Sequence, residues 1–353
     1  MPFGSHTLLL SLEGALFAFG RNEEGQLGLG HKDHQLKPTE VSWNGPQPVQ
    51  VDCGWQHSLV LDAEGGVWDA GCSRSSSLTF QEVLGLPCIV LVAAGDLHSA
   101  AIDREGGLWV WTSRHSSWAN SVPQRLKGLP PLIKVACGNY FLVAEAEEGL
   151  WVLGNNSFGQ LGLGHTDSVL QPTFVQVENC SQGPLRCLAV FYEGVILIDS
   201  QGGVFSSGGN LYGQLGRSSG DASKLQQVDN IPPMLAASCG KYHTLCLDEN
   251  GNVWAWGCGK EGQLGTGTTS NKRQPTLVPS LKGISALVAG MDYSLAFPQE
   301  GGLLVFGSNY FGQLGLESST KHPSKRTTPT RSALQPALPH SFTRSRKKSA
   351  RFL

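Results

Sequence analysis

The amino-acid sequence predicts an all-β fold, a seven-bladed β-propeller, and three observations lead to this prediction. The 353 residues include 45 glycines, and 15% of the residues are charged, against usual values of ~7% and ~25%. Long surface helices need charged side chains to cover them, so this composition argues against a helical protein. Short apolar strands separated by turns recur at a period near 50 residues, which is typical of propellers.

The repeat can be followed at the residue that ends an aromatic strand. Seven positions, spaced by 51, 41, 42, 54, 49 and 50 residues, carry it: Gly20, Gly71, Thr112, Gly154, Gly208, Gly257 and Gly307. Each unit supplies four expected strands, A to D. Strand A is an apolar run such as 132–136, and strand B is a His-Ser-Leu-Val-Leu segment such as 57–61. A turn joins strand B to strand C, such as 66–71, as in a hairpin. Strand D is a Pro-x-x-Val segment such as 38–41, where Pro suits an edge.

A second repeated block, Gly-Gln-Leu-Gly, stands between strands C and D in five units. It occupies residues 25–28, 159–162, 213–216, 262–265 and 312–315. Recurrence in so many units indicates a structural role. We expect Leu to fill the space between blades, the glycines to form turns, and Gln to bond the backbone of its own loop.

These motifs resemble the RCC1 family, the regulator-of-chromosome-condensation repeats, over residues 3–315. The resemblance implies one propeller domain, residues 1–317, built from seven repeats. It does not by itself imply a function, because folds host many functions.

The sequence departs from the repeat at several places. Units two and three are about ten residues short and carry residues 73–77 and 113–117 where the Gly-Gln-Leu-Gly block is expected. Unit five has lost the Cys-Gly pair that precedes strand B. No Pro-x-x-Val or apolar strand follows residue 315 at the expected offset. The sequence therefore predicts that two strands of the closing blade are missing.

Charge is distributed unevenly along the chain. Residues 318–353 contain nine Lys or Arg and no Asp or Glu, which leaves 17 basic and 28 acidic residues in 1–317. The acidic body does not suit binding to nucleic-acid phosphates. The basic tail 318–353 is expected to be disordered, and it could bind chromatin or an acidic surface, or act as a nuclear signal through 344–348.

The sequence does not favour metal, cofactor or membrane chemistry. None of the nine cysteines forms a C-x-x-C pair, so neither a zinc site nor a disulfide framework is expected. Residues 257–262 match G-x-G-x-x-G without a βαβ context, and we interpret them as a repeat turn rather than a dinucleotide site. The N-terminus lacks the features of a signal peptide, and no apolar run would span a membrane. A cytoplasmic or nuclear protein without a small-molecule substrate is expected.

A histidine recurs at the start of strand B, at His6, His57, His98 and His243. We expect each histidine to cap its own blade by hydrogen bonds, with contact to a partner as the alternative. The resemblance implies that loops at this strand end face a small GTPase, with one contact made by Asp in a Gly-x-Asp-His context. Only Asp292, followed by Tyr293, fits that context. The matching position elsewhere holds Gln56, Leu97, Tyr140 and Tyr242. The candidate partner-binding residues are therefore Asp292, Tyr293, Tyr242, His243, Gln56, His57 and His98.

The function expected from the sequence is that of a non-enzymatic protein-interaction propeller. The scaffold repeats while the exposed loops vary from blade to blade, which is typical of a binding face. No catalytic residues are assigned. One alternative is a guanine-nucleotide exchange factor for a Ran-like small GTPase, although the family's exchange wedge lies in an early blade and units two and three are short. A second alternative is a regulatory propeller from a ubiquitin ligase or kinase.

Overall fold

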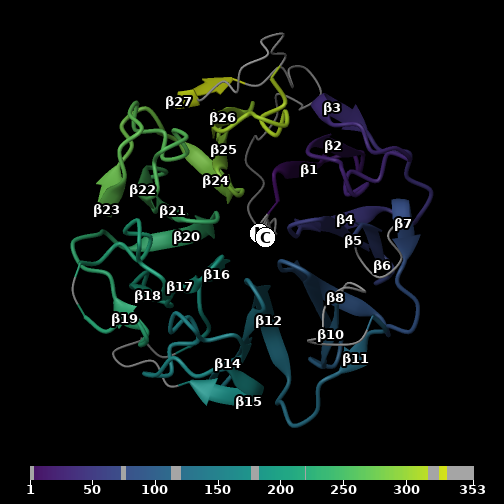
Figure 1. The fold of residues 1–353 in the computed structure, drawn as a ribbon, viewed down its shortest axis with the longest axis horizontal. Helices are drawn as coiled ribbons and strands as arrows, with labels where there is room; N and C mark the ends of the chain where they lie inside the picture. Colours follow the sequence, from purple (N-terminus) through teal and green to yellow (C-terminus); the bar gives the residue numbers. More distant parts are fainter. Residues whose placement is uncertain are drawn as a thin grey trace.

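The computed structural model describes residues 4–72, 77–112, 121–175, 183–218, 220–316 and 326–331. Seven antiparallel sheets stand around a central axis as the blades of a propeller (Figure 1). Among the described residues, six blades have four strands and the N-terminal blade has three. The described part of the chain contains no helix that is long and apolar enough to cross a membrane.

The strands of blades one to three follow one another from the axis to the rim. Blade one consists of β1 (His6–Leu10), β2 (Leu16–Gly20) and β3 (Gln35–Glu40). Blade two consists of β4 (Pro48–Cys53), β5 (His57–Asp62), β6 (Val67–Gly71) and β7 (Ser77–Glu82). Blade three consists of β8 (Ile89–Ala94), β9 (His98–Asp103), β10 (Leu108–Thr112) and β11 (Gln124–Arg125).

The remaining blades repeat this order. Blade four consists of β12 (Leu132–Cys137), β13 (Phe141–Ala146), β14 (Gly149–Gly154) and β15 (Val169–Val175). Blade five consists of β16 (Cys187–Phe191), β17 (Gly194–Ile198), β18 (Val204–Gly208) and β19 (Gln226–Gln227). Blade six consists of β20 (Met234–Cys239), β21 (His243–Asp248), β22 (Val253–Gly257) and β23 (Lys272–Leu277). Blade seven consists of β24 (Ile284–Ala289), β25 (Tyr293–Pro298), β26 (Leu304–Gly307) and β27 (Arg326–Arg331).

The predicted strand order is confirmed. Strands of type A, such as β4 and β12, lie nearest the axis, and strands of type D, such as β7 and β15, lie at the rim (Figure 1). Strand C ends at all seven predicted residues. In blades two, three, five and six an Asp carboxylate holds the B–C turn. In blade three, Asp103 Oδ1 accepts the backbone N–H groups of Glu105 and Gly107, and Asp103 Oδ2 accepts Trp109 Nε1–H at 2.8 Å.

The two ends of the propeller differ in what they carry. The A–B loops and the C–D loops share one end, because the residue after strand C donates its N–H to the residue before strand B, as Cys258 does to the Tyr242 carbonyl at 2.7 Å. We call this end the loop face. The B–C turns and the D–A connections lie at the opposite end, which we call the turn face.

Leu of each Gly-Gln-Leu-Gly block fills the space between blades, as predicted. These five leucines are fully buried, with exposures of 0–1%: Leu27, Leu161, Leu215, Leu264 and Leu314. Leu215 of blade five, for example, belongs to one apolar cluster with Met234 and Trp256 of blade six. Burying a leucine of this kind contributes roughly 1.5–3 kcal/mol, so the block stabilises the contact between neighbouring blades.

The expectation for the closing blade is wrong in one respect. β27 lies within the segment predicted to be a disordered tail, and it pairs with β26 in the register Leu304↔Arg331 and Val305↔Thr330. The outer strand of blade seven is therefore present, although Ser332 stands in the sequence where the Val of Pro-x-x-Val was sought after Pro329. Among the described residues β1 has only β2 as a strand partner. The remaining tail, the basic residues 344–348 and the replacement segments 73–76 and 113–117 lie outside the described residues.

Candidate functional site

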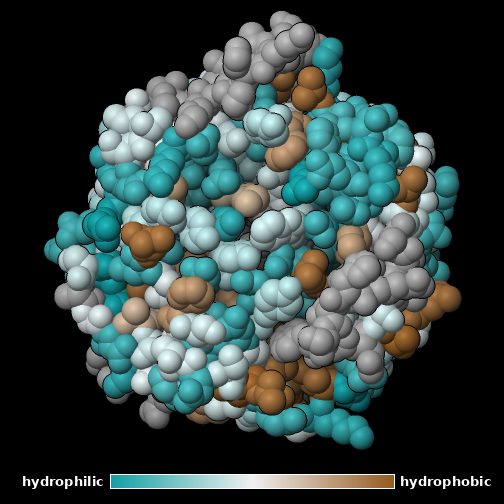
Figure 2. Space-filling view, viewed as in Figure 1, coloured by the Kyte–Doolittle hydropathy of each residue, from teal (hydrophilic) through white to brown (hydrophobic). Residues whose placement is uncertain are grey.

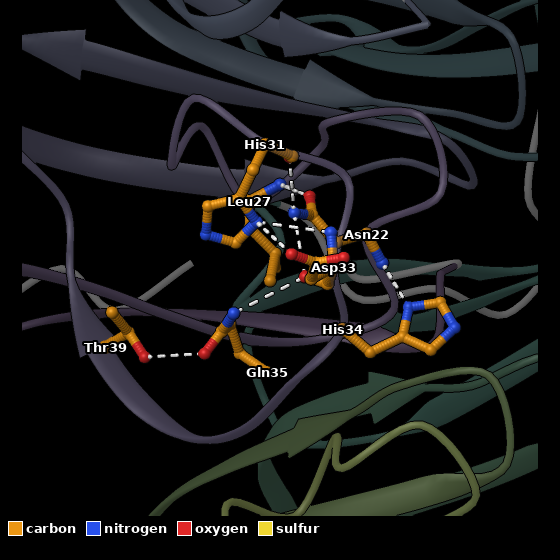
Figure 3. A network of polar contacts seen from close by, with 7 residues as sticks. All are labelled: Asn22, Leu27, His31, Asp33, His34, Gln35 and Thr39. Carbon is orange, nitrogen blue, oxygen red and sulfur yellow. Dashed lines mark hydrogen bonds and ion pairs between the residues drawn. The ribbon is translucent and has the colours of Figure 1, made fainter.

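The C–D loops of the loop face are held by their own side chains. In blade one, Asn22 Oδ1 accepts the N–H of Leu27 at 2.9 Å, and Asn22 Nδ2 donates to the carbonyls of His31 and Asp33 (Figure 3). Asn22 N donates in turn to His34 Nδ1 at 3.1 Å. Asn156, Asn210 and Asn309 accept the equivalent Leu N–H in blades four, five and seven. The Asn five residues before Leu is a loop-forming residue that the sequence analysis missed.

The Gln of each block bonds its own loop, as predicted. Gln26 Oε1 accepts the N–H of Glu24 at 3.0 Å, and the four other glutamines do the same two residues upstream. The backbone carbonyl of this Gln also accepts a hydrogen bond from the next blade. The Gln26 carbonyl accepts a hydrogen bond from Ser58 Oγ of blade two at 2.7 Å. The C–D loop of one blade is thereby joined to strand B of the next.

The recurrent histidines bond the following blade rather than their own, which corrects the expected capping role. His6 Nε2 lies 2.9 Å from Ser58 Oγ, and His243 Nε2 lies 2.9 Å from Ser294 Oγ. His57 and His98 make the equivalent bonds to Ser99 Oγ and the Phe141 carbonyl of the next blade. Because Ser58 and Ser294 donate their own protons to Gln carbonyls, Nε2 must carry the imidazole proton.

This arrangement leaves the histidines neutral. In His6, His57 and His243, Nδ1 is buried and has no hydrogen-bond partner, so protonation would place an unsatisfied N–H and a charge in the interior. Burial lowers the pKa of His6, His98 and His243 to about 3 and that of His57 to about 4. These side chains are scaffold groups.

The glycine before each A–B loop provides the space for the aromatic ring. A Cβ on Gly240 would lie 2.2 Å from His243 Cε1, a distance at which real atoms clash. Blade five keeps the same packing with the two residues exchanged between strands, because the Phe191 ring lies against Gly194, where a Cβ would come 2.1 Å from Phe191 Cζ. The loss of Cys-Gly in unit five is therefore a swap, not a defect.

Tyr293 joins blade seven to blade one. Its hydroxyl donates to the His6 carbonyl at 2.6 Å and accepts a hydrogen bond from Thr7 Oγ1 at 2.9 Å. Thr7 Oγ1 also lies 3.0 Å from the Gln313 carbonyl. Tyr thus takes the place of His at the point where the propeller closes.

The seven candidate residues from the sequence therefore separate into two groups. His57, His98, His243 and Tyr293 are at most 1% exposed, so they do not belong to a surface that a partner could touch. Gln56, Tyr242 and Asp292 are partly exposed in the A–B loops.

In blades two, five and six, the side chains of the residues two positions before strand B contact one another at the axis. Lys241 Nζ of blade six lies 5.3 Å from the Trp55 ring of blade two, 4.9 Å from the Tyr192 ring of blade five and 5.2 Å from the Tyr242 ring. Trp55 and Tyr192 have centroids 5.9 Å apart although their blades are not neighbours. Such a contact requires both side chains to extend over the central channel. Cation–π contacts of this kind contribute about 0.5–2 kcal/mol each.

Three carboxylates lie within electrostatic reach of Lys241. We call the whole set the axial cluster: Trp55, Asp96, Tyr192, Glu193, Lys241, Tyr242 and Asp292. Burial raises the pKa of Asp96 to about 6 and also raises the pKa of Glu193 and of Asp292, while Lys241 opposes each shift. Tyr192 and Tyr242 have their pKa raised to about 12, first by burial and then by nearby carboxylates. Within the described residues, no three or more His, Cys, Asp or Glu side chains are arranged to hold a metal ion.

Exposed apolar side chains stand on the C–D loop tips around the axial cluster. Phe158, Leu211 and Tyr310, in blades four, five and seven, are 47%, 71% and 64% exposed. Large exposed apolar and aromatic side chains at loop tips are typical of protein contact surfaces. Figure 2 shows one face of the propeller, on which hydrophilic residues predominate and hydrophobic residues form several separate small groups.

Comparison with known proteins places these features in a family. A family model, regulator of chromosome condensation (RCC1) repeat, matches residues 13–61, 147–184, 201–247 and 250–297, and a second model of this repeat matches 236–263. The mouse E3 ubiquitin-protein ligase HERC2 is 27% identical over 307 residues, which are 83% of this chain but 6% of that protein. The human Regulator of chromosome condensation is 26% identical over 356 residues, covering 88% of this chain and 84% of that protein.

Among solved structures, Prp20p from Saccharomyces cerevisiae superposes with a TM-score of 0.79 at 19% identity, covering 92% of this chain and 87% of that one. This likeness concerns the fold. The segments matched by the family model make up more than half of the chain. Three of the four run from the B–C turn of one blade to strand B of the next, so the sequence repeat is offset from the blade by two strands. The chain therefore belongs to the RCC1 repeat family.

Proposed function

We propose that the protein is a non-enzymatic interaction propeller that binds a protein partner through its loop face. The observation that carries this proposal is the contrast between the two halves of each A–B loop. The glycine and the aromatic ring repeat as scaffold, whereas the side chains directed to the axis change from blade to blade. A constant frame with variable loops supports recognition rather than further stability.

The C–D loop tips provide the test. Replacing Phe158, Leu211 and Tyr310 together by Ser should remove the partner from affinity-captured material, because exposed apolar anchors supply much of the binding energy of such contacts. The folded propeller should be retained, since these side chains are exposed. Quantitative mass spectrometry of the captured proteins gives the measurement.

A matched control changes the turn face instead. Leu12 and Leu84 are 57% and 66% exposed at that end, and the Leu12→Ser, Leu84→Ser variant should retain the partner. Capture of the same proteins by wild type and by the loop-tip variant would contradict the proposal.

A second candidate function is guanine-nucleotide exchange on a Ran-like small GTPase, and Asp292 is the observation that favours it. Asp292 fits the family's Gly-x-Asp context and lies beside Lys241 at the loop face. The related Prp20p is described together with its binding properties to Gsp1p and histones. An exchange factor of this kind binds the nucleotide-free GTPase better than the loaded form.

Nucleotide release tests this candidate. If the protein is an exchange factor, it should accelerate release of a fluorescent guanine nucleotide from a Ran-like GTPase. Asp292→Asn should reduce the acceleration at least about tenfold if a charged hydrogen bond worth about 1.5–3 kcal/mol is lost, while Glu64→Gln on the turn face should not. Release at the spontaneous rate throughout a panel of small GTPases would exclude exchange activity on them.

A further inference from the structure

The axial cluster has more negative charge than its own cation can neutralise. Three carboxylates face one ammonium group, so the ionised cluster carries two uncompensated negative charges. In the described part of the chain, Asp96, Glu193 and Asp292 accept no side-chain hydrogen bond and form no ion pair within 4 Å. Buried carboxylates are normally paired, so the unpaired Asp96, which is buried, calls for an explanation.

Asp96 is the most informative of the three. It is 6% exposed, yet its carboxylate has no partner among the described residues, and it lies within electrostatic reach of Lys241, Tyr192 and Tyr140. Asn139, in the next A–B loop, adds a buried Oδ1 that receives no hydrogen bond. Both groups are acceptors without donors.

Lys241 does not supply those donors. Its ammonium group lies over three aromatic rings at 4.9–5.3 Å and makes no ion pair within 4 Å in the described residues. A metal ion is not favoured as the ligand, because no three His, Cys, Asp or Glu side chains of the described residues are arranged to hold one.

We propose that the axial cluster binds an arginine side chain of the protein partner. This inference rests on the loop face being the partner-binding surface. A guanidinium group carries five donors in a planar fork, pairs with carboxylates and stacks on aromatic faces. The axial cluster offers both kinds of group, with Asp96, Glu193 and Asp292 as acceptors and Tyr192, Tyr242 and Trp55 as aromatic walls. Lysine lacks the planar fork and fits this combination less well.

A fluorescein-labelled hexaarginine peptide provides a defined probe for the full chain, with binding measured by fluorescence anisotropy at low salt. The variant Asp96→Asn, Glu193→Gln, Asp292→Asn should weaken binding at least about tenfold, since each charged hydrogen bond contributes about 1.5–3 kcal/mol. A control variant, Glu13→Gln, Glu64→Gln, Glu300→Gln, removes the same formal charge from exposed turn-face positions. It should leave the affinity within about threefold, because screened surface charges contribute little.

Lys241→Met gives a second readout that does not depend on weakening the site. It removes the competing cation and keeps an unbranched side chain over the aromatic rings, so the hexaarginine peptide should bind several-fold more tightly. Hexalysine should bind more weakly than hexaarginine, and hexaglutamate should not bind.

Equal affinities for wild type and the three-carboxylate variant, equal affinities for hexaarginine and hexalysine, no gain with Lys241→Met, or no binding to wild type would each overturn the arginine assignment. Failure of the proposed function is distinguishable from these results. If the loop-tip variant loses the captured partner while the three-carboxylate variant retains it, the loop face binds the partner and the arginine assignment is wrong.

Discussion

Lowering the pH from 7.5 to 5 is expected to reduce the free energy of unfolding by several kcal/mol, because four buried histidines must stay neutral in the folded propeller. The folded-state pKa of His6, His57, His98 and His243 is about 3–4, against 6.5 for an unfolded chain. The unfolded chain therefore binds more protons below pH 6.5. Stability is complete above pH 6.5 and falls as the pH drops toward the folded-state pKa.

The expected loss of stability follows from these pKa differences. At pH 5 each histidine lowers the free energy of unfolding by about 2 kcal/mol, and four histidines that act independently lower it by about 8 kcal/mol. The raised pKa of Asp96, Glu193 and Asp292 acts in the opposite direction and offsets part of this loss. The net change should still be destabilising.

Denaturant titrations at pH 7.5 and pH 5 measure the effect. His243→Gln retains an N–H that can reach Ser294 but cannot titrate. This variant should show a difference between the two pH values that is smaller by about 2 kcal/mol than that of wild type. An unchanged difference would contradict the assignment of a neutral buried His243.

Tyr293→Ala is expected to destabilise the propeller by about 3–5 kcal/mol, as truncation of a fully buried aromatic side chain does. Tyr293 is 0% exposed, and its hydroxyl connects blade seven to His6 and Thr7 of blade one. Tyr293→Phe keeps the aromatic ring and removes the hydroxyl, so it should cost about 1–3 kcal/mol. Equilibrium unfolding gives both values.

Tyr242→Phe is the matched control for the hydroxyl. Tyr242 lies in the neighbouring A–B loop, is half-buried, and its hydroxyl makes no hydrogen bond among the described residues. Loss of the Tyr242 hydroxyl should change the free energy of unfolding by less than about 0.5 kcal/mol. Equal effects of the two Tyr→Phe substitutions would mean that the Tyr293 hydroxyl does not stabilise the closure of the propeller.

The repeat made most of the scaffold predictable. Strand ends, hairpins and the buried leucines follow from patterns that recur in many units. The destination of the histidine hydrogen bonds did not follow, because a pattern within one unit cannot tell whether a side chain bonds its own blade or the next. β27 was missed because Pro329 follows Gly315 by 14 residues instead of ten and Ser332 stands where Val was sought. An edge strand can be held by backbone pairing alone.

The axial cluster could be predicted only in part. Tyr242 and Asp292 were found because they precede strand B, the position that the family resemblance pointed to. Trp55, Asp96 and Lys241 stand one residue earlier, where the residue type changes in each blade. A search for recurrence therefore passes over them. The propeller brings these unlike residues together at the axis, and only the three-dimensional arrangement reveals their combination of charges and aromatic rings.

Hydrogen–deuterium exchange of the chain with its captured partner tests the central claim most directly, because it maps the contact on the unaltered protein. Partner binding should slow exchange in the A–B loops at 54–56, 95–97, 192–193, 240–242 and 290–292, and in the C–D loops near 158, 211 and 310. The B–C turns at 11–14, 62–66 and 248–252 should keep their rates. Protection confined to the B–C turns, with unchanged loops around Lys241, would contradict binding through the loop face.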